Sequence, residues 1–253
     1  MNVRAPAADT SPFDLGAREA RVAVLCLHGL TGTPYEVRPL GEALRRAGIR
    51  ALGPALPGHN ETPEALARVK REDWLAAARD ALDMLRASHS RVAVAGLSLG
   101  GLIALSVGAE APVDGLAVIG TPLRLRIPLQ GLLPVLRRIV PYARKRLGSD
   151  IRDLPARQRH PSYDRMPLAS VEQLCRLQAS VRGRLARIHA PILVAHGAHD
   201  ATAHPDDARV IAAGVASAER ELLWLESSAH VVPVDRDGPR LAAAVVAHFA
   251  RLA

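Results

Sequence analysis

A single serine stands between two glycines in the stretch GLSLG at 96–100, directly after the apolar run 92–95. If a strand ends at the first glycine and a helix begins at the second, Ser98 lies on a sharp turn whose neighbours two positions away must be small. Such a turn lifts the hydroxyl above the sheet and aims the amide of Leu99 at the space in front of it. The helix N-terminus behind the serine favours negative charge that develops there. The spacing therefore predicts that Ser98 is a nucleophile.

A serine hydroxyl is a weak nucleophile near neutral pH, so it needs a histidine base and a carboxylate that orients this base. Asp200 follows the apolar run PILVA in the sequence AHGAHD, and His230 follows the run ELLWLE in SSAH. The order Ser98, Asp200, His230 is the nucleophile–acid–histidine order expected when the serine lies on a strand–turn–helix. Each of the three follows a predicted strand, at the carboxyl end where open α/β sheets place their sites. We therefore predict a triad of Ser98, Asp200 and His230.

An acyl-transfer reaction also needs backbone N–H donors for the oxyanion of its tetrahedral intermediate, each typically worth roughly 100- to 1000-fold in rate. The turn HGLTG at 28–32 follows the first strong apolar run and is suitably placed for this purpose. We expect the amide of Leu30, together with that of Leu99, to form the oxyanion hole. His28 is expected to orient the turn through hydrogen bonds, because His230 already fits the proton-transfer role.

Other acids and histidines could compete for these roles. Three further aspartates are rival acids: Asp164, Asp235 and Asp237. Asp235 follows His230 too closely to orient it from a separate loop. Three histidines near Asp200 could suggest a metal cluster: His196, His199 and His204. Their spacing matches no common zinc pattern, so we expect no metal site there.

The segments that must position these residues alternate between two patterns. Short apolar runs predict strands at 21–27, 49–56, 91–96, 113–119, 191–195 and 221–225. Apolar residues at helical spacing predict helices at 35–47, 73–87, 100–109, 206–216 and 239–252. Strands that are apolar throughout favour a mainly parallel sheet covered on both faces, and right-handed crossovers make it doubly wound. The predicted fold class is therefore α/β.

The segment 122–187 interrupts this alternation, because it contains only proline-punctuated helical pieces such as GLLPVLRRIV and LASVEQLCRLQ. It is too long for an ordinary connection and too apolar for a linker. We interpret it as an inserted helical cap; the alternative is an extra pair of helices packed on the sheet. The predicted organisation is an N-terminal extension at 1–20, a core at 21–121 and 188–253, and the cap at 122–187. Cap residues are expected to line an acyl pocket: Leu132, Leu133, Leu136 and Ile139.

The composition restricts the class of partner. The chain has 253 residues, enough for one large α/β domain, and a formal net charge of +8. Its arginines are spread along the sequence, with a modest concentration at 124–159, and no nucleic-acid-binding motif accompanies them. We therefore expect a small-molecule substrate and no nucleic-acid partner. The cap arginines are expected to be solvated, and weak association with anionic lipid surfaces is the alternative.

Two further features concern the location of the chain. Cys26 and Cys175 lie far apart and are expected to be free thiols. Residues 1–16 contain no apolar segment of signal-peptide type, and no run is long enough to span a bilayer. A cytoplasmic location is therefore expected, and the oligomeric state stays open.

The sequence resembles the α/β-hydrolase superfamily and, within it, the small bacterial carboxylesterases and monoacylglycerol-lipase-like enzymes. The pieces that carry the resemblance are HGLTG at 28–32, PALPGHNETPEAL at 54–66, EDW at 72–74, GLSLGG at 96–101, HD at 199–200 and SAHVVPVD at 228–235. They run in family order over nearly the whole chain. The resemblance implies the triad and oxyanion hole named above, and hydrolysis of carboxylic esters without a metal or an organic cofactor.

The chain departs from this group at several points. Asn60 stands where the group often has a second glycine, although asparagine also tolerates left-handed backbone angles. A single glycine follows His28, a pattern that goes with esters of simple alcohols rather than bulky tertiary alcohols. The first strands of larger members are expected to be missing or vestigial.

The expected substrates are short- to medium-chain acyl esters or monoacylglycerols. A thioesterase or a perhydrolase could use the same triad. An alternative of another class is a non-catalytic α/β-hydrolase-fold protein that binds a small molecule.

Overall fold

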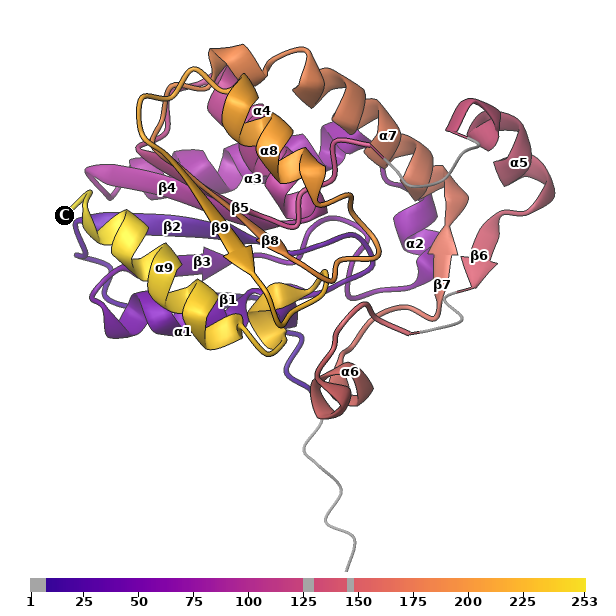
Figure 1. The fold of residues 1–253 in the computed structure, drawn as a ribbon, viewed down its shortest axis with the longest axis horizontal. Helices are drawn as coiled ribbons and strands as arrows, with labels where there is room; N and C mark the ends of the chain where they lie inside the picture. Colours follow the sequence, from indigo (N-terminus) through magenta and orange to yellow (C-terminus); the bar gives the residue numbers. More distant parts are fainter. Residues whose placement is uncertain (1–7, 125–129, 145–147) are drawn as a thin grey trace, which may run out of the picture.

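The molecule is built around one mainly parallel β-sheet, and the computed structural model describes residues 8–124, 130–144 and 148–253 (Figure 1). Seven strands form this sheet in the order β1-β3-β2-β4-β5-β8-β9. They are β1 (Phe13–Leu15), β2 (Val22–Leu27), β3 (Arg50–Gly53), β4 (Arg91–Leu97), β5 (Gly115–Ile119), β8 (Ile192–Gly197) and β9 (Arg220–Leu225). Every neighbouring pair is parallel except β1 with β3. The predicted α/β class is confirmed.

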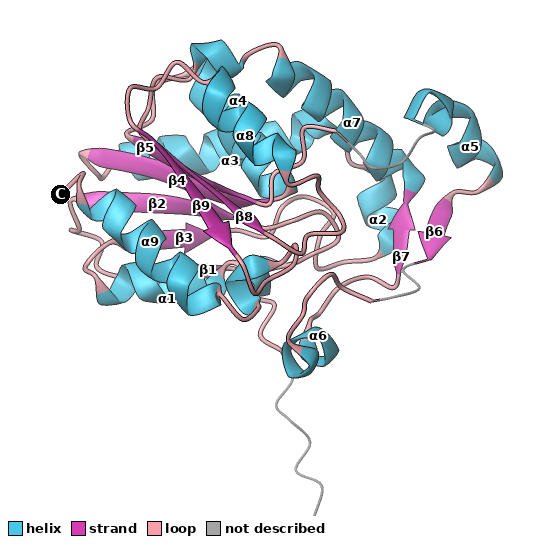
Figure 2. Ribbon diagram, viewed as in Figure 1, coloured by secondary structure: helices cyan, strands magenta, loops and turns pink. Residues whose placement is uncertain are grey.

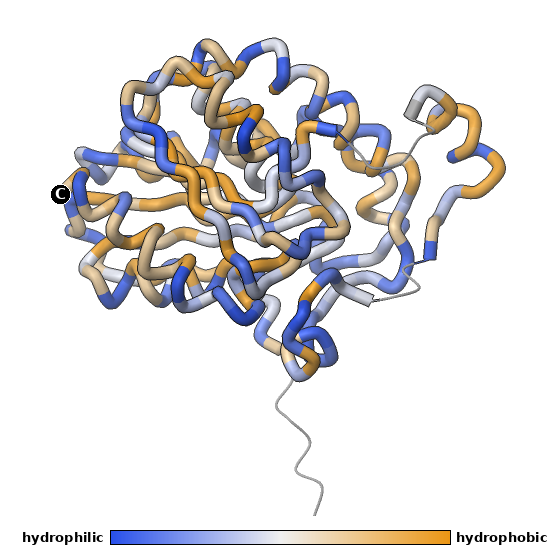
Figure 3. The backbone as a smooth tube through the Cα atoms, viewed as in Figure 1, coloured by the Kyte–Doolittle hydropathy of each residue, from blue (hydrophilic) through white to orange (hydrophobic). Residues whose placement is uncertain are grey.

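Both faces of the sheet are covered, which explains why the inner strands β2, β5 and β8 are buried along their whole length and strongly apolar (Figure 3). One face carries the helices α3 (Arg71–Arg86), α4 (Leu99–Glu110) and α8 (Asp206–Gly214). The other carries α1 (Arg38–Arg46) and α9 (Gly238–Ala250) (Figure 2). Along β2 the side chains alternate between the two core layers, with Leu25 and Leu27 in the first and Val24 and Cys26 in the second. Because helices cover both faces of this parallel sheet, the arrangement is doubly wound.

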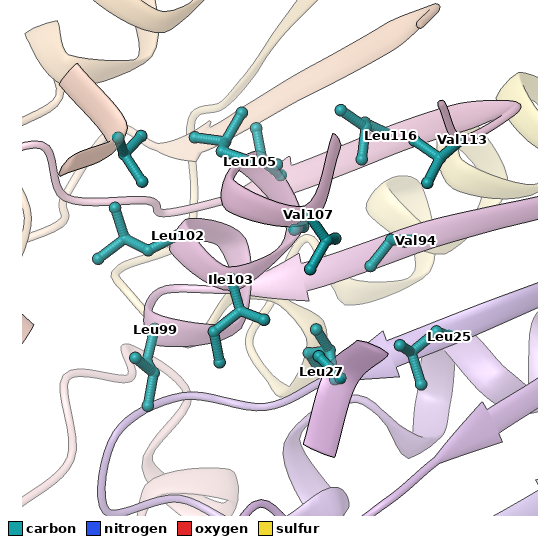
Figure 4. Packing of buried hydrophobic residues seen from close by; sticks show 14 of the residues in the cluster. Leu25, Leu27, Val94, Leu99, Leu102, Ile103, Leu105, Val107, Val113 and Leu116 are labelled. Atoms are coloured by element: carbon teal, nitrogen blue, oxygen red, sulfur yellow. The ribbon is translucent and has the colours of Figure 1, made fainter. Parts of the chain in front are cut away.

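Helix α4, which begins directly after Ser98, is buried from Leu99 to Val107. Figure 4 shows its side chains packed with those of the strands beneath it. Its outer side is covered by α7 (Leu168–Arg182), whose Leu174 and Leu177 belong to the same core. A helix that is apolar all round is typical of such two-sided burial. Because α7 lies in the predicted cap segment, part of that segment packs on the helices of the core.

The other elements between β5 and β8 gather beyond one end of the sheet (Figure 1). They are the helices α5 (Leu133–Ile139) and α6 (Leu154–Arg159) and the strands β6 (Tyr142–Arg144) and β7 (Arg165–Pro167). These two strands form a separate antiparallel pair, so the prediction of a strand-free cap is wrong. Strands of three residues are too short for a period-2 pattern to reveal them.

The short helices complete the list of elements. Helix α2 (Pro63–Arg68) is not among the predicted helices, although Thr62 caps it by accepting from the amide of Ala65 and proline stands at its first position. The 3-10 helices are η1 (Pro34–Glu36), η2 (Gln130–Leu132), η3 (Leu185–Arg187) and η4 (Val232–Val234).

Strand β1 joins the predicted N-terminal extension to the core sheet. It pairs antiparallel with β3, and the ring of Phe13 fills space that a side chain at Gly41 or Gly53 would occupy. The expected vestigial first strand is therefore present, and position 20 does not bound the sheet. None of the described helices combines the length and the apolar character needed to cross a bilayer.

Candidate active site

Ser98 lies on the turn between β4 and α4, with φ 53° and ψ −108°. A non-glycine residue in this region of φ is strained, and such strain gathers at functional sites. Hydrogen bonds on both sides hold the turn: the amide of Ser98 donates to the carbonyl of Ile119 (2.9 Å), and the amide of Leu102 donates to the carbonyl of Ser98 (3.1 Å). The serine side chain therefore projects from a rigid junction of strand and helix.

The flanking glycines are required by close packing of the backbone. A Cβ on Gly96 would lie 2.2 Å from the carbonyl oxygen of Gly100, and one on Gly100 would lie 2.2 Å from that of Leu27. A Cβ on Gly101 would lie 1.9 Å from Oγ1 of Thr121. Any side chain at these positions would push the helix away from the strands and move the serine.

Asp200 and His230 meet at the same end of the sheet. Oδ2 of Asp200 lies 2.8 Å from Nδ1 of His230, and both side chains are buried. The other oxygen, Oδ1, accepts the amides of Thr202 (2.8 Å) and Ala203 (2.7 Å). The carboxylate is thus fixed by its own loop and can hold the imidazole with Nδ1 protonated, leaving Nε2 free to accept a proton.

The charges of this pair support each other. Burial alone would raise the pKa of Asp200, but the imidazoles of His230 and His196 hold it below its ordinary value. Burial alone would lower the pKa of His230, but the Asp200 carboxylate, followed by Asp150 and Glu36, raises it above its ordinary value of 6.5. The site therefore favours the imidazolium that forms when a serine proton is taken up.

Ser98 and His230 line one cavity of about 350 Å³. Within the described part of the chain, no hydrogen bond joins the Ser98 hydroxyl to the imidazole. Such contacts are often long without substrate and tighten when it binds. The arrangement brings the acid and the histidine into contact and the serine into their cavity.

The candidate oxyanion donors lie beside Ser98. Leu30 lines the cavity, whereas the side chain of Leu99 is buried in the core and only its backbone is available. The amide of Gly29 donates to Oε2 of Glu36 (2.7 Å), and that of Thr31 donates to Nε2 of His59 (3.3 Å). Among the described residues, no acceptor takes the amide hydrogens of Leu30 and Leu99. These two amides are therefore the ones left for an oxyanion.

The His28 side chain holds this loop through hydrogen bonds, as predicted. Its Nδ1 lies 2.9 Å from the carbonyl of Gly29, and its Nε2 accepts the amide of Leu56 (3.1 Å). Burial lowers the pKa of His28, so the ring stays neutral and can do both. Asn60 has φ 60°, so the asparagine adopts the left-handed conformation that the missing glycine would have served.

The rival acids have other partners. Asp235 accepts the amides of Arg152, Asp153 and Ala229 at 2.8–2.9 Å. Asp237 accepts from the serines at 227 and 228, and the side chain of Asp164 is 89 % exposed. Over residues 8–124, 130–144 and 148–253, no group of three ligating side chains could hold a metal ion. Nε2 of His196 instead lies 2.9 Å from Oδ2 of Asp200, without the alignment of a hydrogen bond.

Comparison with known proteins decides the family. The family model described as "Serine aminopeptidase, S33" matches residues 18–237. The chain belongs to this family.

Its relatives narrow the chemistry. The thermostable monoacylglycerol lipase of Bacillus sp. (strain H-257) is 31% identical over 236 residues, which cover 93% of each chain. The carboxylesterase of Bacillus subtilis (strain 168) is 29% identical over 219 residues, covering 85% of this chain and 87% of the relative.

Solved structures agree. One, from work on the metagenome-derived lipolytic enzymes LipS and LipT, matches with a TM-score of 0.90 at 28% identity, covering 96% of this chain and 98% of its own. The Paleococcus ferrophilus monoacylglycerol lipase shares the fold, with a TM-score of 0.84 at 20% identity, over 97% of this chain and 100% of its own. Together these findings make the family member an ester-hydrolysing serine hydrolase with the α/β-hydrolase fold.

The four cap residues expected to form the acyl pocket do not line this hydrolase's cavity: Leu132, Leu133, Leu136 and Ile139. Leu133 packs against Leu168 and Val171 with Leu136 beside them, and Leu132 and Ile139 are exposed. The apolar face of α5 is thus directed at α7 rather than at the serine. The apolar lining comes from other residues: Leu97, Met166, Val171, Leu174 and Val231.

Asp150 lies at the site although no sequence signal pointed to it. The backbone carbonyl of Asp150 accepts the amides of His230 (3.1 Å) and Val231 (3.2 Å). Its carboxylate accepts the amide of Ala201 (2.9 Å) and the hydroxyl of Thr202 (2.9 Å). Asp150, which lies in the cap segment, is therefore hydrogen-bonded both to the loop that follows Asp200 and to the loop that carries His230.

Gly120 also lies at the site and was not predicted, although it directly follows a predicted strand and could have been found from that position. It has φ 51°, and a Cβ there would lie 3.3 Å from Nδ1 of His230 and 3.5 Å from Oδ2 of Asp200. The absence of a side chain leaves room for the acid–histidine pair.

Proposed function

We propose that this hydrolase cleaves short- to medium-chain acyl esters, including monoacylglycerols, through an acyl-enzyme on Ser98. The observation that carries the proposal is the hydrogen-bonded Asp200–His230 pair, whose imidazole lines the same cavity as the serine on its strained turn.

The mechanism follows from the roles of these groups. His230 Nε2 takes the proton of Ser98 as Oγ attacks the ester carbonyl carbon, while Asp200 stabilises the imidazolium. The amides of Leu30 and Leu99 donate to the oxyanion of the tetrahedral intermediate. When the intermediate collapses, the C–O bond to the alcohol breaks and His230 gives its proton to the leaving oxygen. His230 then takes a proton from water as the water oxygen attacks the acyl-enzyme carbonyl. When this second intermediate collapses, the bond to Oγ breaks and His230 gives its proton to Ser98, which frees the acid and the serine.

The lining of the cavity supports an amphiphilic ester. Its apolar part includes Leu97, Met166, Val171 and Leu174, which suit an acyl chain. Its polar part includes Ser149, Asp150 and Thr202, which suit a hydroxylated alcohol such as glycerol. A monoacylglycerol combines both properties, and the curated relative named above carries that activity in its name.

The test replaces Ser98 by alanine. Ser98→Ala should lower ester turnover by about 1000-fold or more and abolish labelling by a fluorophosphonate probe, with an unchanged melting temperature. Ser106→Ala is the matched control, because Ser106 is a buried serine on α4, the helix that begins directly after Ser98, and the variant should keep full activity. Wild-type ester hydrolysis by Ser98→Ala would refute the proposal, and a wild-type protein that the probe does not label would favour the binding-protein alternative.

The substrate class needs a second measurement. A chain-length series of p-nitrophenyl and glyceryl esters, with matched thioesters, peroxide as an alternative acyl acceptor and peptide amides alongside, should give the highest kcat/KM for an ester. A preference for the thioester or for peroxide would assign the triad to a thioesterase or a perhydrolase instead.

We further propose weak association with anionic lipid surfaces through α5 and its neighbours. Four apolar side chains there are exposed: Leu132, Val135, Ile139 and Val140. Arg138 adds positive charge to the same helix, whereas Arg137 is paired with Glu172 (2.8 Å). Exposed apolar groups beside cations are typical of peripheral lipid contact. The cytoplasmic location stays a prediction, which subcellular fractionation tests.

A further inference from the structure

The cavity contains a buried carboxylate that has no role in the proposed reaction. Glu36, on η1, lines the cavity together with Ser98 and His230, and its side chain is only 5 % exposed. Burial alone would raise its pKa, but the hydrogen bond and charge of His160, with His28 and the Gly29 amide, lower the pKa to about 2. Glu36 is therefore an anion at every pH at which an esterase is assayed.

An anion beside an oxyanion hole opposes the charge that the hole must stabilise, so it needs a compensating role. Its contacts supply one. Oε2 of Glu36 accepts the amide of Gly29 at 2.7 Å, the residue directly before Leu30. The amide of Gly29 is thereby turned toward Glu36, and the next amide along the chain is the one left for the cavity. The carboxylate thus fixes the peptide plane that adjoins the candidate donor.

The loop is shaped around this carboxylate. A Cβ on Gly29 would lie 3.1 Å from Oε2 of Glu36, and one on Gly32 would lie 2.2 Å from the same atom. Both glycines of the turn HGLTG therefore leave the space that Glu36 occupies. The amide of Gly32 also donates to the carbonyl of Gly29 (3.2 Å), which closes the turn on itself.

The cap completes the arrangement through His160. Nε2 of His160 lies 3.1 Å from Oε1 of Glu36, and its Nδ1 lies 2.7 Å from the hydroxyl of Ser149. The His160 side chain is 2 % exposed, so this pair is buried between core and cap at the wall of the cavity. The next residues of the cap continue the contact, because the Ser162 hydroxyl (3.2 Å) and the Tyr163 amide (3.4 Å) both donate to the carbonyl of Thr31.

We propose that Glu36 is a positioning residue that orients the Gly29–Leu30 peptide as an oxyanion donor, and that His160 makes this orientation depend on a docked cap. The proposal rests on the proposed function. A cap that lifts would remove both the partner of the carboxylate and the contacts on Thr31. The hole would then form only over an enclosed substrate.

The first test separates positioning from stability. Glu36→Ala should lower kcat by about 10- to 100-fold with KM within about twofold, since one misplaced donor affects the transition state more than the bound ester. Glu36→Gln should stay within about fivefold of the wild-type kcat, because its amide oxygen can still accept from Gly29 while its NH₂ donates to Nε2 of His160. Asp114→Ala is the matched control. The Asp114 carboxylate also accepts hydrogen bonds from a backbone amide, that of Val92 (2.7 Å), and from a cationic side chain, that of Arg91 (2.8 Å). These contacts lie at the opposite end of the strands from the cavity. Asp114→Ala should lower the melting temperature and leave kcat unchanged.

A trifluoromethyl ketone supplies a second readout, because its adduct with serine carries an oxyanion. Glu36→Ala should weaken inhibition by this ketone by the same factor as kcat, while inhibition by the matching long-chain alcohol stays constant. A merely structural role would weaken both equally.

Two results would overturn the proposal: a folded Glu36→Ala protein with kcat within twofold of wild type, or a Glu36→Gln protein as impaired as Glu36→Ala. If Glu36→Ala does not fold, His160→Ala replaces it, with an expected 3- to 10-fold loss of kcat at constant KM, and no loss overturns the proposal. Should Ser98→Ala be inactive while these variants behave as wild type, only the positioning role fails. Should Ser98→Ala stay active, the proposed function itself fails.

Discussion

Two parts of the same insertion serve different purposes. The inner cap segment, residues 148–163, is hydrogen-bonded to loops of the core: Asp150 to the acid and histidine loops, and His160 to Glu36 beside the oxyanion loop. The outer arm, residues 130–144, packs mainly on α7 and β7 through Leu133 and through the strand pair. Figure 3 shows hydrophobic stretches along the helix of the outer arm, α5, which also carries Arg137 and Arg138.

The difference shows what marks a functional part of a cap. Apolar periodicity in the outer arm signals that one face is buried, and the partner of that face is a neighbouring helix. Polar residues in the inner cap segment meet backbone groups of loops that carry the reactive side chains, and a buried backbone donor or acceptor needs such a partner. Hydrogen bonds to those loops, rather than hydrophobicity, identify the part that positions the chemistry.

The largest effect in the cap is expected from removing the Asp150 carboxylate, which tests whether the inner cap segment positions the catalytic loops. Asp150→Ala should lower kcat/KM by about tenfold, because the Ala201 amide and the Thr202 hydroxyl lose their acceptor and the loop of Asp200 loosens. The loss should be smaller than that of Ser98→Ala, since the backbone carbonyl at 150 still holds His230. Steady-state kinetics on a soluble p-nitrophenyl ester measure it.

Asp153→Ala is the control within the same segment. Its carboxylate caps α6 by accepting the amide of Ala156 at 2.8 Å, and losing it should cost about 1 kcal/mol of stability without changing kcat/KM. Equal activity losses in the two variants would mean that the inner cap segment acts only through its stability.

The pH dependence of kcat/KM tests whether charges of the inner cap segment act on His230. His230 must be neutral to act as the base, and its pKa is raised because the Asp200 carboxylate, then Asp150 and Glu36, outweigh the effect of burial. kcat/KM should therefore fall as the pH drops through this raised pKa, with a midpoint above 6.5. Asp150→Asn removes one of these negative charges, which lowers the pKa of His230 and moves the acid limb to lower pH.

The matched variant in the outer arm is Arg138→Gln, which should leave the midpoint unchanged. An acid limb that moves equally in both variants, or that moves to higher pH in Asp150→Asn, would contradict the assignment. The limb is followed over the whole range with one substrate of fixed charge.

The same comparison explains what the sequence could and could not reveal. Ser98, Asp200 and His230 each follow an apolar strand, and parallel strands bring their carboxyl ends to one edge, so local pattern and topology suffice to expect them together. The contact between Glu36 and His160 joins residues 124 positions apart and depends on how the cap settles, which no local period encodes. Leu133 and Leu136 pack against α7 and not at the cavity, because periodicity gives the direction of a face and not the identity of its partner.

The smallest expected effect lies in the outer arm. Ile139 is 74 % exposed, so Ile139→Asp should leave kcat/KM on a soluble short-chain ester within about twofold of wild type. It should reduce binding to phosphatidylglycerol vesicles by about fivefold, because an apolar contact is replaced by a charge that the anionic surface repels. Co-sedimentation with these vesicles, and with phosphatidylcholine vesicles for comparison, measures the change. Met84→Asp on α3, where Met84 is 51 % exposed, should bind vesicles as the wild type does. If Ile139→Asp binds phosphatidylglycerol vesicles as well as the wild type does, or slows hydrolysis of the soluble ester, the outer arm does not act as the lipid-contacting part. The proposed difference in role between the outer arm and the inner cap segment would then be wrong.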